Sequence, residues 1–311
     1  YGAGEAWHAA GKRVSEGFLS NSGDAASELY YRGFNAVWSG GVLSLSRVPA
    51  SALGSVQVLR KEDEDGRVML EFTDGQGEKV MVRRIIGAGK CDTHYVYDAF
   101  GRLTVVLPPS LTERLESSGL SAWRESDMAD LAYLYRYDSR GNCIARLLPG
   151  AGWIYQVYDR GGRLVLSQDA VMRQEGKWRF MLQDVFGRGC LDGVAELSVD
   201  AFPDPFGDAA VFVSMPEAPD YGSPLLGYEL NGFSLNGPIE VLNVNYYDGY
   251  GFVGEGVFPA EGAAYDVTAE TEYTAMYPMS ASGLLTGTLA KVIGGSGGGG
   301  KVGAGMFFDG G

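Results

Sequence analysis

The chain has 311 residues, of which 45% are hydrophobic, so it can bury a sizeable core and is not disordered throughout. Its formal net charge of −14 repels phosphate backbones, which excludes nucleic acid as an expected partner. No apolar run reaches the roughly 18 residues of a membrane-spanning helix, and the three cysteines, Cys91, Cys143 and Cys190, are too far apart for a zinc site or disulfide framework and are expected as buried free thiols.

Glycine and aromatic residues dominate the composition. There are 47 Gly, and 18 Tyr and 14 Phe stand against 5 Trp. Glycine is the residue of tight turns and aromatic residues favour strands, so this mixture predicts a mainly β protein with many short strands. Because the chain starts at Tyr1 and ends at Gly310-Gly311, we interpret it as an internal piece of a longer protein.

Six segments are expected in chain order. They are an irregular or β segment (1–55), the first hairpins (56–107), a short helical insertion (108–132), tandem repeats (133–193), an irregular β insertion (194–282) and a further, truncated repeat (283–311). In the helical insertion, Ser110 and Glu113 have the spacing of a capping box and place Leu111 and Leu115 on one face. Ser126-Asp127 is expected to cap a second short helix, and 294–300 reads as a flexible glycine loop.

One short pattern recurs along the chain: an aromatic residue, Asp, two residues, Gly, a polar residue and an apolar residue. Successive Asp positions are 24, 21 and 25 residues apart where no longer insertion intervenes. Weaker copies surround Asp74 and end the chain at Phe307-Phe308-Asp309-Gly310. The residues assigned to the repeat turns are Tyr97, Asp98, Gly101, Arg102, Tyr137, Asp138, Gly141, Tyr158, Asp159, Gly162, Arg163, Asp184, Gly187, Arg188, Tyr247, Asp248 and Gly251.

The pattern has the chemistry of a turn. Asp suits the first position of a type I turn, and Gly three residues later suits the left-handed position of a bulge, so Gly101 and Gly162 should have positive φ. Together these residues predict a hairpin with a three-residue loop. Folding over places Asp98 opposite Arg102, Tyr97 opposite Leu103, Tyr95 opposite Val105, Tyr137 opposite Cys143 and Tyr158 opposite Leu164. The aromatic and aliphatic members of the first hairpin would then share one face.

Nothing in the sequence singles out a catalytic, cofactor-binding or metal-binding residue. The Tyr-Asp pairs could form an acid–base dyad or a sugar platform, but the turn interpretation accounts for every copy. His94 is expected in a strand, satisfied or exposed, and it forms no metal pair with His8. Asp63-Glu64-Asp65-Gly66 lacks the ligand spacing of a calcium loop, and Asp65-Gly66 reads as another hairpin turn. We therefore expect no enzyme, no cofactor and no metal.

The copies resemble the YD repeat of RHS-type proteins. The stretches 93–109 and 131–193 are similar to long YD-repeat proteins of gut Bacteroidetes, and 283–294 fits the same pattern. Asn142 in place of Arg, and Gly189 in place of an apolar residue, depart from it. The resemblance implies consecutive antiparallel hairpins that form a curved sheet or shell segment with short helical insertions. Asp204-Pro205-Phe206-Gly207 matches four residues of a self-cleavage element of that family, but it is interpreted as a turn because repeats continue beyond it.

The resemblance also implies a function. It suggests a non-catalytic scaffold of a secreted or surface protein, partnered by its remaining YD repeats and enclosing or displaying a C-terminal, toxin-like domain. The alternative is a cell-surface adhesin that binds glycans, for which Trp153, Tyr155 and Trp178 would be stacking platforms. A variable nuclease- or deaminase-like tail in the full gene would favour the shell, and a sorting signal or lectin module would favour the adhesin.

Overall fold

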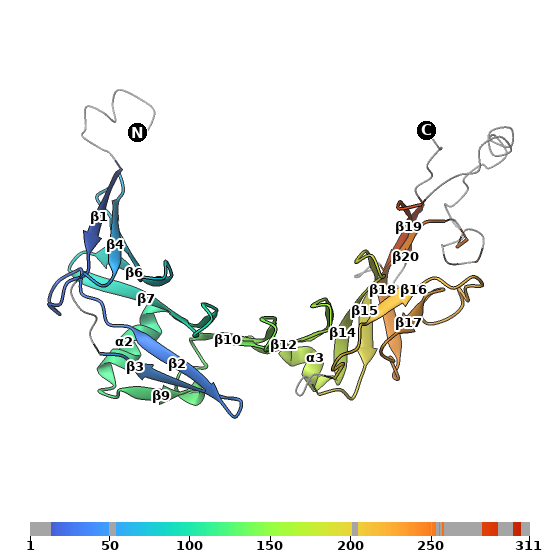
Figure 1. Cartoon of the computed structure of the whole chain (residues 1–311), viewed down its shortest axis with the longest axis horizontal. Helices are drawn as coiled ribbons and strands as arrows, with labels where there is room; N and C mark the ends of the chain where they lie inside the picture. Colours follow the sequence, from blue (N-terminus) through green and yellow to red (C-terminus); the bar gives the residue numbers. More distant parts are fainter. Residues whose placement is uncertain are drawn as a thin grey trace, which may run out of the picture. The chain divides into compact units, whose positions relative to one another are not determined.

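The computed structural model describes residues 14–49, 54–200, 205–249, 251, 252, 255, 257, 282–291 and 301–305. These residues are mainly antiparallel β structure (Figure 1), which confirms the predicted fold class. His8, Asp204, the glycine loop 294–300 and the last motif at 307–310 lie outside the described residues.

The main sheet has 15 strands. They are β1 (Ser15–Ser20), β4 (Gln57–Glu62), β5 (Val68–Thr73), β6 (Lys79–Ile86), β7 (Gly89–Tyr97), β8 (Leu103–Leu107), β10 (Tyr133–Tyr137), β11 (Cys143–Leu148), β12 (Gly152–Tyr158), β13 (Leu164–Gln168), β14 (Lys177–Gln183), β15 (Gly189–Glu196), β18 (Ile239–Tyr247), β19 (Leu285–Lys291) and β20 (Lys301–Gly305). Neighbours in the chain are neighbours in the sheet except where an insertion intervenes, as expected of consecutive hairpins.

The other elements belong to two small sheets and three helices. One sheet has the order β2 (Phe34–Ser39), β3 (Val42–Arg47) and β9 (Ala122–Arg124), and the second pairs β16 (Phe212–Ser214) with β17 (Glu229–Asn231). The described helices are α2 (Pro109–Ser117), the 3-10 helix η1 (Glu125–Asp127) and α3 (Ala170–Gln174). None of them is long and apolar enough to cross a membrane.

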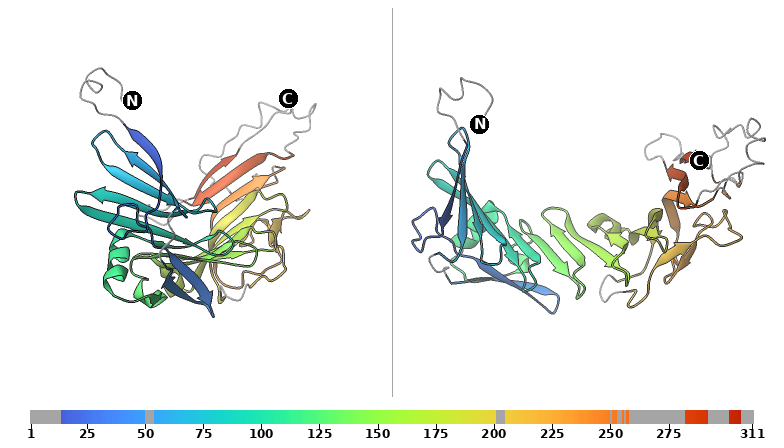
Figure 2. Two further views of the ribbon diagram at one scale, coloured as in Figure 1. Left: turned by 60° about the vertical axis from the view of Figure 1, so that its left-hand side comes forward. Right: turned by 45° about the horizontal axis from the view of Figure 1, so that its top comes forward.

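The chain divides into two compact units, whose ribbons are drawn in Figure 2. Each unit has its own buried core. Unit 1 comprises residues 1–137 and 145–153, and unit 2 comprises residues 138–144 and 154–311. In unit 1, the small sheet β2-β3-β9 and helix α2 bury apolar side chains against β7, β8 and β10. The fully buried members of that cluster are Leu43, Leu45, Val105, Leu107, Leu111, Met128, Ala132 and Leu134.

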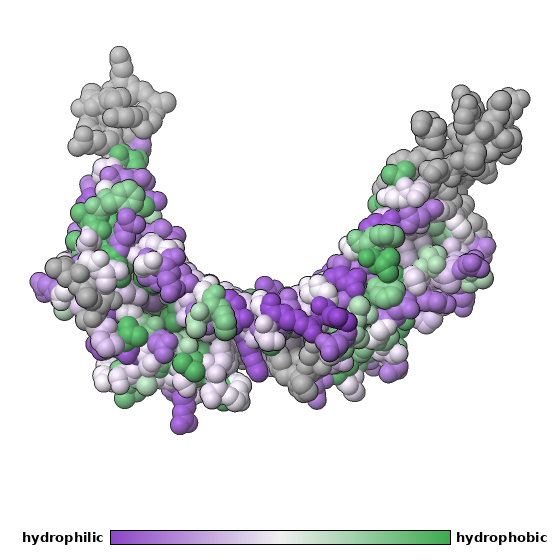
Figure 3. Space-filling model, in the orientation of Figure 1, coloured by the Kyte–Doolittle hydropathy of each residue, from purple (hydrophilic) through white to green (hydrophobic). Residues whose placement is uncertain are grey.

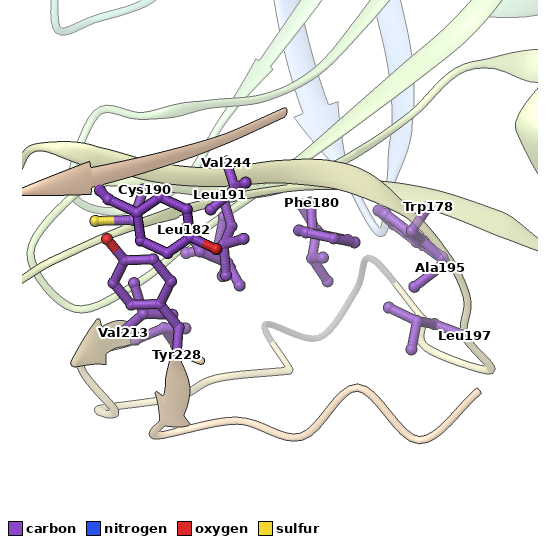
Figure 4. Close-up of a cluster of buried hydrophobic side chains, with 14 of the residues drawn as sticks. Trp178, Phe180, Leu182, Cys190, Leu191, Ala195, Leu197, Val213, Tyr228 and Val244 are labelled. Atoms are coloured by element: carbon purple, nitrogen blue, oxygen red, sulfur yellow. The ribbon is translucent and has the colours of Figure 1, made fainter. Parts of the chain in front are cut away.

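The core of unit 2 is built on β14 and β15 (Figure 4). Trp178, Phe180 and Leu182 alternate along β14 and are all buried, because successive side chains of a strand point to opposite faces. Val213 of β16 and Tyr228 cover them from the other side. The described part of the 194–282 insertion thus closes this core.

Both helices of the 108–132 insertion start and are capped differently from the sequence prediction. Helix α2 begins at Pro109, its N-cap is Pro108, and no side chain caps it, so the expected capping box is wrong. Proline suits the first helical position, which places Ser110 inside the first turn instead of before it. The second helical piece is a 3-10 turn that starts at Glu125, and the Asp127 carboxylate accepts the Arg124 N–H at 2.8 Å. Leu111 and Leu115 are buried, as predicted.

The register of the first hairpin also needs a correction. Tyr97 pairs with Leu103 as expected, but a bulge follows, so Tyr95 pairs with Val106 instead of Val105. The extra residue exchanges the two faces of the strand beyond it. Val96 and Val105, paired across the ladder, are therefore the buried core residues. The tyrosines are half-buried on the opposite face.

Candidate functional site

The turn at Asp98 shows how the recurring motif is built. The Asp98 N–H donates to the carbonyl of Arg102 at 2.9 Å, and the Gly101 N–H donates to the carbonyl of Asp98 at 3.0 Å. One carboxylate oxygen, Oδ1, accepts the N–H groups of Phe100 at 2.9 Å and Arg102 at 3.0 Å. Gly101 has φ +73°, which costs glycine little because it has no Cβ. The aspartate thus closes the turn with both its backbone and its side chain.

Six turns in the described chain share this pattern. In each one the Asp N–H donates to the carbonyl four residues later, and the N–H of that residue donates back to Asp Oδ1. The turns start at Asp63, Asp74, Asp98, Asp138, Asp159 and Asp184, and their glycines, Gly66, Gly77, Gly101, Gly141, Gly162 and Gly187, all have positive φ. The turn that the sequence predicts at Asp65-Gly66 starts two residues earlier, at Asp63, where no aromatic residue precedes the Asp. The Asp-x-x-Gly-Arg spacing was the available signal.

In four of the six turns, those at Asp98, Asp138, Asp159 and Asp184, the side chain four positions after the Asp also donates to its carboxylate. Arg102 Nε donates to Asp98 Oδ2 at 2.7 Å. In the turn at Asp138, where Asn142 replaces the usual Arg, Asn142 Nδ2 donates to Asp138 Oδ2 at 2.8 Å. The amide thus keeps the hydrogen bond to the carboxylate that the guanidinium makes elsewhere. Burial alone would raise the pKa of the Asp98 carboxyl, but the hydrogen bonds from Arg102 and Phe100 outweigh it and hold that pKa below its ordinary value.

The motif tyrosine joins its hairpin to the preceding one. Three motif hydroxyls donate to the backbone carbonyl that lies five residues after the Asp of the previous turn. The three observed pairs are Tyr97 to Lys79 at 3.1 Å, Tyr137 to Leu103 at 2.9 Å and Tyr247 to Gly189 at 3.1 Å. A phenylalanine could fill the same space but could not donate, which explains why the repeat uses tyrosine.

The motif arginine makes a second link between consecutive hairpins. The Arg102 guanidinium lies 4.9 Å from the ring centre of Phe100 in its own turn and 5.0 Å from that of Tyr137 in the next hairpin. Arg188 repeats the arrangement with Phe186 at 5.2 Å and Tyr247 at 4.5 Å. Such cation–π contacts favour a fixed stacking of one hairpin on the next.

Replacing Tyr137 by Phe tests the tyrosine link. We expect the free energy of unfolding to fall by about 1 kcal/mol, because the Leu103 carbonyl loses its donor while the ring remains over Arg102. Urea denaturation measures the change, with Tyr133→Phe as the control, since Tyr133 lies in the same strand and is 37% exposed. Equal losses in the two variants would contradict the assigned role.

Glu78 occupies the position that is Arg in most of the turns. Burial first, and then the carboxylates of Asp74 and Asp98, raise the pKa of Glu78. Replacing Glu78 by Arg should therefore stabilise the chain by about 0.5–1 kcal/mol in low salt, since repulsion becomes a partly exposed ion pair. Glu78→Gln, which removes only the repulsion, should fall between the two in the same urea measurement. An Arg variant less stable than the Gln variant would refute this explanation.

The turn at Asp248 is not the hairpin that the sequence predicted. Gly251 does not close it, and the returning strand starts at Leu285, which pairs with Tyr247. The Asp248 N–H donates to the Leu284 carbonyl at 3.1 Å, and Gly283 supplies the glycine with φ +82°. The insertion therefore sits inside the turn and separates the Asp from its Gly. No arginine follows that Gly, and Arg188 of the preceding turn binds the Asp248 carboxylate at 2.6 Å instead.

His94 and the large aromatic residues lie in the cores. His94 is buried between Tyr31 and Phe34, and its Nδ1 has no hydrogen-bond partner among the described residues, so its prediction as satisfied or exposed is wrong. Trp178 is only 1% exposed, and Trp153 packs against the core of unit 1. Tyr155 packs against the core of unit 2 and lies 4.6 Å below the Arg173 guanidinium.

The cysteines and acidic residues form no metal cluster in the described part of the chain. All three cysteines are free thiols. Cys190 is buried, as expected, and burial raises the pKa of its thiol to about 11, whereas Cys91 and Cys143 are only half-buried.

No known family model matches this chain, and no curated protein matches it. Among the solved structures that resemble it are the crystal structures of TcdB2-TccC3-Cdc42 and TcdB2-TccC3-TEV and a Photorhabdus luminescens Tc holotoxin pore. They superpose on 85%, 82% and 80% of this chain, with TM-scores of 0.41, 0.40 and 0.41 and identities of 12%, 11% and 12%. The chain spans only 11%, 12% and 10% of the length of those chains.

Proposed function

We propose that this chain is a non-catalytic scaffold segment of a large secreted or surface YD-repeat protein, which encloses or displays a C-terminal, toxin-like domain. The observation that carries the proposal is the use of the motif residues. Asp closes each turn, Tyr bonds to the preceding hairpin, and Arg stacks between the two. Each repeat is thereby fitted to the next, which is what an extended β scaffold requires.

The state of the motif carboxylates supports a structural role over acid–base chemistry. A general acid or base at neutral pH needs a pKa near 7 and access to a substrate proton. Hydrogen bonds instead lower the pKa values of Asp98, Asp159 and Asp248, because together they outweigh the opposing effect of burial, and each carboxylate accepts bonds from backbone or arginine donors. Groups held in this way have little capacity to exchange a proton.

The adhesin alternative has less support. Its proposed platforms, Trp153, Tyr155 and Trp178, all pack against core side chains. On the face shown in Figure 3, hydrophobic residues lie in separate groups between hydrophilic ones. That distribution suits a scaffold with a solvated surface.

Limited proteolysis of the whole protein that contains this chain tests the proposal. An enclosed C-terminal domain should resist protease in the whole protein and lose that resistance when expressed alone. A displayed domain should be cut at its linker while the repeats stay intact. A whole protein with no domain after its repeats would refute the proposal. So would glycan-cleaving activity of the purified chain that is lost in Asp98→Asn.

A further inference from the structure

Strand β2 is the outer strand of the small sheet in unit 1, and one of its edges pairs with no other strand of the described residues. Arg47 donates its N–H to Ser121, and Leu45 pairs with Trp123 of β9. The backbone groups of Arg47 and Leu45 therefore point toward β9 and not toward β2. Their partners in β2 are Phe34 and Ala36, whose backbone groups do not bond to β3 and so point to the opposite edge of β2.

This edge has donors and acceptors available. Trp38 follows the same alternation as Ala36, so its N–H and C=O also point away from β3. Within the described residues, no backbone group of Ala36 or Trp38 makes a hydrogen bond on this side. The Trp38 indole N–H is bonded to the carbonyl of Tyr135 at 3.1 Å, which holds the strand in place. An unpaired edge of this kind is a template for another strand.

A cleft of about 550 Å³ runs along the same edge. Four consecutive residues of β2, 35–38, line it, which places the strand edge, and not just one face, in the wall of the cleft. The opposite wall comes from the Asp98 turn and from β10. The β2–β3 hairpin is drawn in blue in Figures 1 and 2.

The side chains in the cleft define what it could hold. The charged side chains that line the cleft are Arg102, Arg136 and Asp98, and Arg102 forms an ion pair with Asp98. The lining is therefore net positive, although the net charge of the chain is −14. Apolar surface comes from Trp38, which the Arg136 guanidinium overlies at 5.9 Å, and from Phe100, which is 82% exposed. Both acidic and apolar side chains of a ligand would find complementary groups.

We propose that an extended peptide with alternating apolar and acidic side chains binds in this cleft by adding a strand to the unpaired edge of β2. Main-chain hydrogen bonds to Ala36 and Trp38 would supply affinity, and the arginines and exposed rings would select the side chains. This site goes beyond the scaffold role, and either can fail without the other.

Fluorescence anisotropy with labelled peptides tests the proposal. The probe alternates Val and Glu over about seven residues, the usual strand length, and its partner alternates Val and Lys. Two further probes carry N-methyl groups on only the Val or only the Glu positions, which removes the N–H donors from one edge of the peptide and leaves the protein unchanged. We expect the Val-Lys probe, and one of the two methylated probes, to bind at least about tenfold more weakly than the Val-Glu probe.

Charge reversal locates the site. Arg136→Glu should invert the preference between the acidic and basic probes, whereas Arg84→Glu, an exposed arginine outside the cleft, should leave it unchanged. Equal binding of the two charge variants of the probe, or equal loss from both methylation patterns, would overturn the proposal. An unchanged preference in Arg136→Glu would overturn it as well. Self-association through β2 that the probe cannot displace would show a second copy of the chain as the occupant instead.

Discussion

Replacing Asp159 by Ala should lower the free energy of unfolding by about 3 kcal/mol. The Asp159 carboxylate is 0% exposed and accepts Arg163 Nη2 at 2.6 Å and Nε at 2.9 Å. It also accepts the Val211 N–H at 3.1 Å, which ties the 194–282 insertion to the repeat turn. Alanine would leave a buried N–H and a largely covered guanidinium without their acceptor.

The matched control is the same substitution in the exposed turn at Asp63. Its carboxylate is 46% exposed and lies 3.7 Å from Arg67, which is 76% exposed, so water can replace what is lost. We expect Asp63→Ala to cost about 1 kcal/mol or less. Urea denaturation followed by tryptophan fluorescence measures both variants. Similar losses of unfolding free energy in the two variants would show that burial does not determine how much a repeat turn contributes to stability.

The stability of unit 1 should fall by about 3 kcal/mol between pH 6.5 and pH 4. The cause is His94, whose pKa is lowered to about 4, first by burial and then by the nearby Arg83 and Arg47, against the opposing effect of Asp92. Above pH 6.5 the histidine is neutral in both the folded and the unfolded chain, so its protonation does not change the free energy of unfolding. As the pH falls below 6.5, the unfolded chain binds a proton that the folded chain excludes, so folding becomes steadily less favourable until about pH 4.

This pH window separates His94 from the motif aspartates. The pKa values of Asp98 and Asp159 lie below their ordinary value, so their contribution is present above about pH 4 and is lost only below it. The substitution His94→Leu should therefore flatten the curve of unfolding free energy between pH 4 and 6.5, whatever it does to stability at pH 7. The same slope in the variant and in the natural chain would exclude His94 as the cause.

The sequence by itself determined the turns. Asp-x-x-Gly needs only residues within one loop, because the carboxylate bonds to N–H groups two and four residues ahead and glycine takes the positive φ. This local chemistry closes six turns, including the one at Asp63, where the aromatic residue is missing. The same letters at Asp248 do not close a turn, because the returning strand comes from Leu285. The pairing of Tyr158 with Leu164 follows from the same geometry.

Only the tertiary structure decided what lies beyond one hairpin. The core face that Val96 and Val105 share packs against α2 and the small sheet, which come from other parts of the chain, and the tyrosine acceptors Lys79, Leu103 and Gly189 belong to preceding repeats. The closure of the Asp248 turn by Gly283, the burial of His94 and the cleft beside β2 each join segments far apart in the chain. Such contacts exist because folding brings distant residues together to bury apolar surface, and no local pattern of residues records which partner each will find.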